Sequence, residues 1–292
     1  MTTDRPSAAD VAALIPFRRT LGALDPAAPP SAAQVCGRMI SGARRLVAVA
    51  GSFNPPHVAH VGLLRAGRMT THADAGVFVL SARTVDKERV SGMLLEDRLW
   101  LLCQIIGDVD RDGVEGAASP SSSSAAALGV VATNQGLYVD QAAALRRLCP
   151  STEAVVFVVG FDKIVQIFDG RYYQDRDAAL DELFATASFL VAPRDEHTAK
   201  DITDLLDRPE NRRYASGAAP LALDAALAGV SSTAAREAMA RGEAVEHLVP
   251  ERVARFVAAT GCYRAPDGQG PYAARAAALE ALAGPSAGAG NA

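Results

Sequence analysis

Short, nearly continuous apolar runs recur along the chain and alternate with segments in which apolar residues follow a helical spacing. Runs of this kind, rich in β-branched residues, are typical of strands that are covered on both faces of a parallel sheet. We therefore predict strands at residues 46–50, 76–82, 128–133, 154–160 and 188–193, with a weaker one at 220–224.

The amphipathic segments between these runs predict helices at residues 58–69, 95–106, 140–148, 178–185, 232–241 and 251–259. Strands that alternate with helices form βαβ units. The pattern therefore predicts an α/β fold, a Rossmann-like doubly wound parallel sheet that forms a single domain.

Composition divides the rest of the chain. Residues 1–42 are predicted to be an N-terminal extension, with DPAAPPSAA as a loosely ordered linker, and residues 43–264 form the sheet domain. Ser, Gly and Ala dominate residues 111–127, which we interpret as a flexible insertion. Residues 265–292 form an Ala/Gly-rich tail in which residues 273–283 fit one short helix.

The bulk properties are those of an ordinary globular protein, with 49% hydrophobic and 21% charged residues in a chain of 292. A net charge of -4 argues against a broad nucleic-acid-binding face. No apolar run reaches the roughly 18 residues that span a bilayer, and the N-terminus lacks a signal peptide. We therefore expect a cytoplasmic protein with neither nucleic acid nor membrane as a partner.

The four cysteines, Cys36, Cys103, Cys149 and Cys262, are far apart and form no CxxC pair. This spacing indicates neither a zinc site nor a disulfide framework. We expect all four to be buried free thiols.

The first chemical motif follows directly on the run at 46–50. It reads GSFNPPHVAH, residues 51–60, and a helical pattern comes next. Ligands of open α/β sheets bind at such a strand end, and Gly51 permits a close backbone approach. The first helical turn has no acidic residue, so its positive end is available to an anion. His57 and His60 lie here; the alternative is a loop with two incidental histidines.

This segment resembles the GxFxPxHxGH signature of the nucleotidylyltransferase superfamily that carries the HIGH motif. In that family the two histidines contact the ATP phosphates and stabilise charge at the α-phosphate, a role that the resemblance assigns to His57 and His60. Ala59 replaces the family's Gly, and its methyl group either crowds the nucleotide or is harmless. The resemblance also implies ATP contacts for the loop residues Gly51, Ser52 and Phe53.

The second motif, VSSTAAR at residues 230–236, precedes the helical pattern that stops at Gly242. A Ser or Thr before a helix is a common N-cap, so the hydroxyls alone fit a structural role. Arg236 differs, because a cation in the first turn opposes the helix dipole at a cost of about 0.3–1 kcal/mol. Hydroxyls, free N–H groups and this Arg together indicate an anion cradle. We expect Arg236 to lower the stability of the empty protein.

This motif is similar to the family's second signature, ISSTxxR, which holds the ATP phosphates. The sequence after it resembles the end of bacterial nicotinate-nucleotide adenylyltransferases. On both signatures the chain is identified as a member of the nicotinamide/nicotinate mononucleotide adenylyltransferase family over residues 44–263. The resemblance implies phosphate contacts for Ser231, Ser232, Thr233 and Arg236.

Weaker signals lie between the motifs. Gly160 and Asp162 resemble the family's Gly-x-Asp, which helps to bind the adenosine; a helix N-cap is the alternative for Asp162. Lys87, with Arg83 as second choice, resembles a basic residue that the family places near the phosphates, although a solvated surface charge fits equally well. Arg194 closes a predicted strand where the family often has an Arg.

The resemblance implies adenylyl transfer from ATP to a pyridine mononucleotide, with Mg²⁺ entering together with ATP. The acceptor phosphate is already nucleophilic, so the catalytic domain needs only to position the substrates and neutralise charge. No carboxylate cage is evident, which suits a metal held by substrate oxygens and water, with no metal site of the protein's own.

Other functions also fit some of these residues. Pantetheine-phosphate adenylyltransferases share the first motif and cytidylyltransferases share most of both, so either is an alternative within the superfamily. A P-loop kinase would need GxxxxGK[ST] and a dinucleotide reductase would need GxGxxG after the first strand; both are absent. A non-catalytic nucleotide-binding protein is the third alternative, and the presence of both histidines and of Arg236 argues against it.

Overall fold

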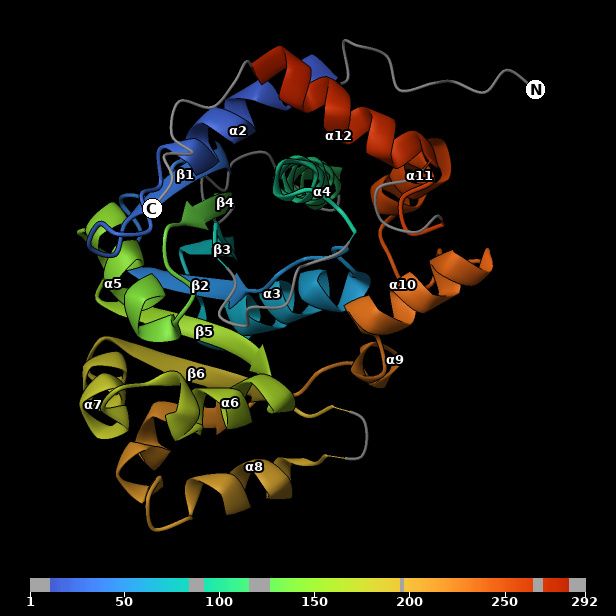
Figure 1. The fold of residues 1–292 in the computed structure, drawn as a ribbon. Coiled ribbons are helices and arrows are strands. Elements are labelled where there is room, and N and C mark those ends of the chain that lie inside the picture. Colours follow the sequence, from blue (N-terminus) through green and yellow to red (C-terminus); the bar gives the residue numbers. More distant parts are fainter. Residues whose placement is uncertain (1–10, 84–91, 116–126, 195–196, 265–269, 284–292) are drawn as a thin grey trace.

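The computed structural model describes residues 11–83, 92–115, 127–194, 197–264 and 270–283 (Figure 1). Its centre is a seven-stranded sheet with the order β1-β4-β3-β2-β5-β6-β7. Neighbouring strands run parallel, except that β1 is antiparallel to β4. The strands are β1 (Ala32–Gly37), β2 (Arg45–Ala50), β3 (Ala75–Ser81), β4 (Ala127–Thr133), β5 (Ala154–Gly160), β6 (Ala187–Ala192) and β7 (Ala218–Pro220).

Helices cover both faces of the sheet (Figure 1). Val47 and Val49 of β2 pack into one apolar cluster, whereas Leu46 and Ala48 pack into a second cluster on the opposite face. Because neighbouring side chains of a strand point to opposite faces, this burial of both faces explains the continuous apolar runs. The predicted doubly wound α/β fold is confirmed.

The first face is covered by α3 (Val58–Thr71), α4 (Leu95–Glu115), α10 (Ser232–Arg241) and α11 (Glu251–Thr260). The second face is covered by α5 (Tyr138–Leu148), α6 (Phe161–Phe168), α7 (Arg176–Thr186) and α8 (Ala199–Leu206). The remaining helical elements are α2 (Ile15–Gly22), α9 (Ala225–Ala228), α12 (Gly270–Ala283) and the short 3₁₀ helices η1 (Gly170–Tyr172) and η2 (Arg212–Gly217).

The order of the strands reverses between β2 and β5, because the chain winds from β2 through β3 to β4 on one side and from β5 to β6 on the other. Such a reversal opens a crevice at the carboxyl ends of the two central strands. Gly51 follows β2 there, and Gly160 ends β5. The topology thus places the first motif and the Gly-x-Asp segment beside the same crevice.

The prediction of a loosely ordered linker at residues 25–33 is wrong. Ala32–Gly37 forms the edge strand β1, so the sheet begins inside the predicted extension. The preceding turn is fixed by Asn134, which is fully buried: its amide nitrogen donates to the carbonyl oxygens of Asp25 (2.8 Å) and Ala28 (3.1 Å). This edge strand, AAQVCG, has neither a continuous run of β-branched residues nor a regular alternation, so the sequence does not indicate it, and one buried amide orders the turn before it.

The prediction of four free thiols is also wrong. Cys36 of β1 and Cys103 of α4 form a disulfide across a sequence separation of 67 residues, with an S–S distance of 1.97 Å. Cys149 and Cys262 are buried free thiols, as predicted. Sequence spacing did not indicate the pair because β1 and α4 become neighbours only through the topology of the sheet.

The tail contains the predicted helix, which is α12, and this helix is part of the core. Arg275 forms an ion pair with Asp97 of α4 at 2.8 Å, and both side chains are buried. The predicted insertion at 111–127 lies largely outside the described residues: α4 reaches Glu115 and β4 begins at Ala127. Among the described residues, every helix is too short or too polar to cross a membrane.

Candidate active site

A cavity of about 650 Å³ opens at the strand reversal. The ends of β2 and β5 form its floor, through Val49, Gly51, Val159 and Gly160. The first turn of α3 and the N-terminal end of α10 form one wall, while α5, α6 and η1 form another. The cavity therefore lies where the topology predicts ligand binding.

The histidine loop, which we define as residues 51–57, turns from β2 into α3. His57 is the N-cap residue of α3 in an extended conformation, and His60 lies one turn further on. The backbone N–H of His57 donates to Nδ1 of His60 at 3.0 Å. The two rings stack with centroids 3.5 Å apart, and both residues line the cavity. The structure therefore brings the two predicted histidines together.

The tautomer of His60 follows from this hydrogen bond. Because Nδ1 accepts from His57, the neutral imidazole carries its proton on Nε2 and is a donor there. Burial, reinforced by the positive charge of Arg194, lowers the pKa of His57 to about 4. Burial and the charges of His57 and Arg194 lower the pKa of His60 well below its usual value. Both rings are therefore neutral at pH 7.

Phe53, unlike the other predicted residues of this loop, does not line the cavity. The residue is fully buried with φ 48°, and its ring packs edge-on against His60 at 4.7 Å and Phe78 at 5.5 Å. The ring of Phe53 therefore helps to hold the ring of His60 in place by packing against it. Its neighbours Gly51 and Ser52 do line the cavity.

The second motif contacts the first directly. Ser231 caps α10 by accepting from the N–H of Ala234 at 3.0 Å. The hydroxyl of Ser232 donates to the carbonyl oxygen of Pro55 at 3.0 Å. Both serines line the cavity, together with Thr233. The two predicted motifs thus form one site.

Arg236 is the fifth residue of α10, just beyond a first turn that contains no acidic residue. Its guanidinium donates to the carbonyl oxygen of Asn54 at 2.7 Å and to the hydroxyl of Thr233 at 3.1 Å. It also lines the cavity. Arg236 therefore faces the ligand space and holds the histidine loop at the same time.

Asp162 lies in the first turn of α6 and lines the cavity, as does Gly160. The N-cap position of α6 is Gly160, so Asp162 is not a helix cap. Its carboxylate lies 3.5 Å from a guanidinium nitrogen of Arg194, which also lines the cavity. Arg83 reaches the cavity from the end of β3, whereas Lys87 lies outside the described residues.

Sequence reasoning missed the aromatic part of the cavity. Tyr138, Tyr172 and Tyr173 line it from α5 and from the segment after α6. The YY pair at 172–173 was visible in the sequence, but nothing in its pattern distinguished these side chains from core residues. The structure thus places three aromatic rings on this side of the cavity, beside polar residues such as Gln141 and Lys163.

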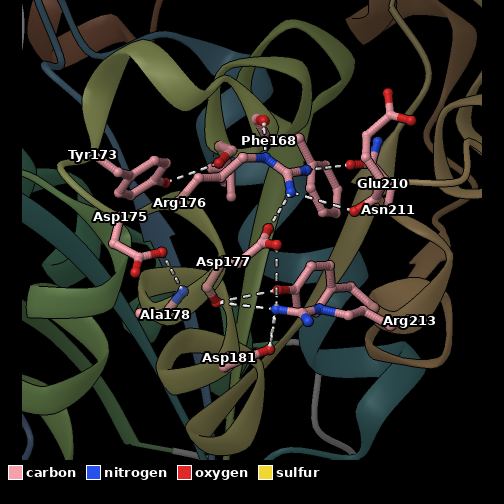
Figure 2. A network of polar contacts seen from close by, with 12 residues as sticks. Phe168, Tyr173, Asp175, Arg176, Asp177, Ala178, Asp181, Glu210, Asn211 and Arg213 are labelled. Atoms are coloured by element: carbon pink, nitrogen blue, oxygen red, sulfur yellow. Dashed lines mark hydrogen bonds and ion pairs between the residues drawn. The ribbon is translucent and has the colours of Figure 1, made fainter.

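Arg176 holds the segment after α6, which contains Tyr172 and Tyr173, through the contacts drawn in Figure 2. Its guanidinium donates to the carbonyl oxygen of Phe168 at 2.9 Å and also to the side chain of Asn211. Tyr173 adds a bond from its hydroxyl to the carbonyl oxygen of Ile167 at 2.8 Å. The segment between α6 and α7 is therefore tied at both ends.

The described residues contain no group of three or more His, Cys, Asp or Glu side chains that could hold a metal ion. Within the described lining, Asp162 is the one carboxylate, and it faces Arg194. Cationic and neutral donor groups therefore dominate the cavity, which suits an anionic ligand.

The chain is similar in sequence to curated adenylyltransferases. The probable nicotinate-nucleotide adenylyltransferase of Geobacter sp. (strain M21) is 24% identical over 230 residues, which cover 73% of this chain and 95% of the relative. The corresponding protein of Geobacter sulfurreducens is 27% identical over 218 residues, covering 71% and 92%. A solved nicotinic acid mononucleotide adenylyltransferase of Plasmodium falciparum, complexed with NaAD, has a TM-score of 0.49 and 12% identity, covering 75% of this chain and 97% of that one. The model of the cytidylyltransferase-like family matches residues 48–238, a segment that contains both motifs, and this protein therefore belongs to that family.

Proposed function

We propose that this protein is an adenylyltransferase that joins the adenylyl group of ATP to the 5′-phosphate of nicotinate or nicotinamide mononucleotide. One observation carries the proposal. The two neutral histidines, the N-terminal end of α10 and Arg236 converge on one cavity at the carboxyl ends of β2 and β5. These groups are hydrogen-bond donors or positive charges, and a triphosphate presents the complementary acceptors.

The neutral and the positively charged groups of the site suit different phosphates of ATP. His57 is buried and His60 is half-buried, and each neutral ring has one N–H donor, so they suit the charge that develops on the α-phosphate during transfer. The free N–H groups at the start of α10 and the guanidinium of Arg236 suit the β- and γ-phosphates. Arg83 and Arg194 add positive charge to the lining.

The reaction is a direct displacement. An oxygen of the acceptor phosphate attacks the α-phosphorus of ATP, the bond from that phosphorus to the bridging β-phosphate oxygen breaks, and pyrophosphate leaves. The acceptor phosphate is already ionised near neutral pH, so the step needs neither a protein nucleophile nor a general base. The scarcity of carboxylates in the described lining fits such a reaction, in which positioning and charge neutralisation lower the barrier.

Mg²⁺ enters this proposal as part of the ATP substrate. The described residues offer no cluster of acidic or imidazole ligands, so the donor set fits a metal that is held by phosphate oxygens and water. When bound, the ion neutralises phosphate charge. The side chains of the protein position the triphosphate around it.

The acceptor assignment is supported by the curated relatives, which are named probable nicotinate-nucleotide adenylyltransferases. The tyrosines on the α5, α6 and η1 side of the cavity provide flat faces on which a pyridine ring can stack. Arg176 holds that segment in place through Phe168 and Asn211 (Figure 2).

The test is an assay of pyrophosphate release with ATP and Mg²⁺, in which the acceptor is varied. Nicotinate mononucleotide, nicotinamide mononucleotide and 4′-phosphopantetheine are compared, and CTP replaces ATP in a parallel series. We expect release only with ATP and a pyridine mononucleotide, together with formation of the dinucleotide. Activity confined to phosphopantetheine or to CTP would assign the protein to another member of the superfamily, and ATP binding without any turnover would indicate a nucleotide sensor.

A further inference from the structure

The histidine loop is held by hydrogen bonds to its backbone carbonyl oxygens. Arg98 of α4 donates to the carbonyl oxygen of Ser52 at 3.2 Å. Arg236 and Ser232, both of α10, donate to the carbonyl oxygens of Asn54 (2.7 Å) and Pro55 (3.0 Å). Two helices that are remote in sequence from the loop thus fix its path.

Asn54 is held by its side chain as well. This residue is 4% exposed, and its Oδ1 accepts from the hydroxyl of Tyr263 at 2.6 Å and from the backbone N–H of Met93 at 3.2 Å. Its backbone oxygen accepts from Arg236. Asn54 therefore connects three segments: the segment before α4, the helix α10, and the chain just after α11.

Tyr263 itself is placed in an unusual way. It adopts φ 71°, a left-handed conformation that bulky residues rarely take. Burial raises the pKa of Tyr263 far above its usual value, so its hydroxyl remains a proton donor across the pH range of an assay. Tyr263 does not line the cavity, and it lies beyond residue 238, where the match to the family model ends.

We propose that Tyr263 is a positioning residue for the transfer reaction: its hydroxyl holds Asn54 and, through Asn54, keeps the histidine loop and Arg236 in register. The inference rests on the proposed function. Transfer at the α-phosphate depends on donors that are placed to within a fraction of an ångström, and a displacement of about 1 Å costs about 100-fold in rate. ATP binding is spread over many contacts, so it depends less on this one bond.

The first variant is Tyr263→Phe, which removes one hydroxyl and keeps the ring. We expect kcat to fall about 10-fold, since the loop retains its other bonds and shifts by less than 1 Å, while the dissociation constant for ATP changes less than about threefold. Rates, ATP calorimetry and melting curves are measured on the same preparations.

The chain offers a matched control in Tyr272→Phe. The hydroxyl of Tyr272 donates to Asp97 at 2.6 Å and accepts from the N–H of Leu94 at 2.7 Å. It belongs to a half-buried tyrosine of the same C-terminal region, and neither of these two partners is a residue of the histidine loop. We expect this variant to melt at a lower temperature and to retain kcat within about twofold, because stability and loop position are separate effects.

A second variant removes the same bond from its other end. Asn54→Ala deletes the acceptor and leaves the backbone oxygen that binds Arg236 in place. We expect a loss in kcat at least as large as that of Tyr263→Phe. Adding Tyr263→Phe to Asn54→Ala should then have no further effect on kcat, since the bond is already gone. Asn54 also accepts from Met93 and lines the cavity, so a loss in Asn54→Ala alone is not specific to this bond, but normal kcat in this variant would overturn the positioning role even if Tyr263→Phe folds poorly.

The outcomes separate the inference from the proposed function. Normal kcat in Tyr263→Phe, an equal loss in Tyr272→Phe, or losses that multiply fully in the double variant would each overturn the positioning role while the wild-type protein remains active. A wild-type protein that is inactive with every acceptor refutes the proposed function, and the positioning role falls with it.

Discussion

The two nitrogen atoms of His60 have different roles, and two substitutions separate them. Nδ1 accepts the backbone N–H of His57 at 3.0 Å, and Nε2 is the donor that is available to a phosphate. The oxygen of an Asn side chain can lie near the position of Nδ1, so His60→Asn keeps the acceptor and removes the donor. The amide nitrogen of Gln can reach the position of Nε2, so His60→Gln keeps a donor and removes the acceptor.

We therefore expect His60→Asn to lose more turnover and His60→Gln to lose more stability. Loss of one preorganised donor to a developing negative charge typically lowers kcat by about 10²–10³, which we expect for His60→Asn with little change in the free energy of unfolding. In His60→Gln the N–H of His57 loses its acceptor in a residue that is 8% exposed, which costs about 1–3 kcal/mol of stability. Its kcat should fall less than that of His60→Asn.

The assay is kcat at saturating ATP and acceptor, combined with urea unfolding of the empty proteins. Both variants lose the ring contacts of His60 with His57 and Phe53, so this shared loss cancels in the comparison. If His60→Asn keeps near-normal turnover, or if His60→Gln proves to be the more stable and the less active of the two, the assignment of the nitrogen atoms is refuted.

The pKa of His57, the contacts of Arg236, the methyl group of Ala59 and the disulfide each lead to a measurable prediction. Because the pKa of folded His57 is lowered from 6.5 to about 4, the unfolded chain binds more protons in this range, and melting temperatures should fall as the pH drops from 6.5 to 4; a flat profile would contradict this. Arg236→Gln should weaken ATP binding by about 1.5–3 kcal/mol and also destabilise the empty protein, since the histidine loop loses a charged donor; calorimetry and urea unfolding measure the two effects, and unchanged ATP affinity would count against the phosphate contact. Ala59→Gly should cost up to about 1 kcal/mol of stability and tighten ATP binding by allowing a closer approach, whereas weaker binding in an ATP titration would show that the methyl group is needed. Reduction of the disulfide between Cys36 and Cys103 should cost about 2–4 kcal/mol, visible as a lower melting temperature, and equal melting with and without reductant would refute this.

The sequence predicted the central strands well because their physical signal is local. A strand buried on both faces is a continuous apolar run, and β5 at Ala154–Gly160 coincides with its prediction. β1 has no such signal: it is a half-buried edge strand, AAQVCG, whose place depends on pairing with β4. α8 was missed as well, since it is a short amphipathic helix of 8 residues between loops.

For the site, the motif residues could be predicted and their connections could not. His57, His60 and Arg236 were found because residue types and spacing mark them. Arg98 looks in sequence like one charged residue of an amphipathic helix, yet it is 2% exposed and donates to the histidine loop. Tyr263 bonds to Asn54 across 209 residues of sequence, a contact that only the folded topology creates.

Arg236 shows why a residue that disfavours its own helix is compatible with a stable empty protein. A cation in the first turn of a helix opposes the helix dipole by about 0.3–1 kcal/mol, and Arg236, in the second turn of α10, opposes it by less. A hydrogen bond from a charged group contributes about 1.5–3 kcal/mol, and Arg236 makes one to the carbonyl oxygen of Asn54 at 2.7 Å. The contact outside the helix therefore outweighs the unfavourable dipole before any ligand is present. The structure thus replaces the expectation of a structural liability, because the side chain that lines the cavity also joins the second motif to the first.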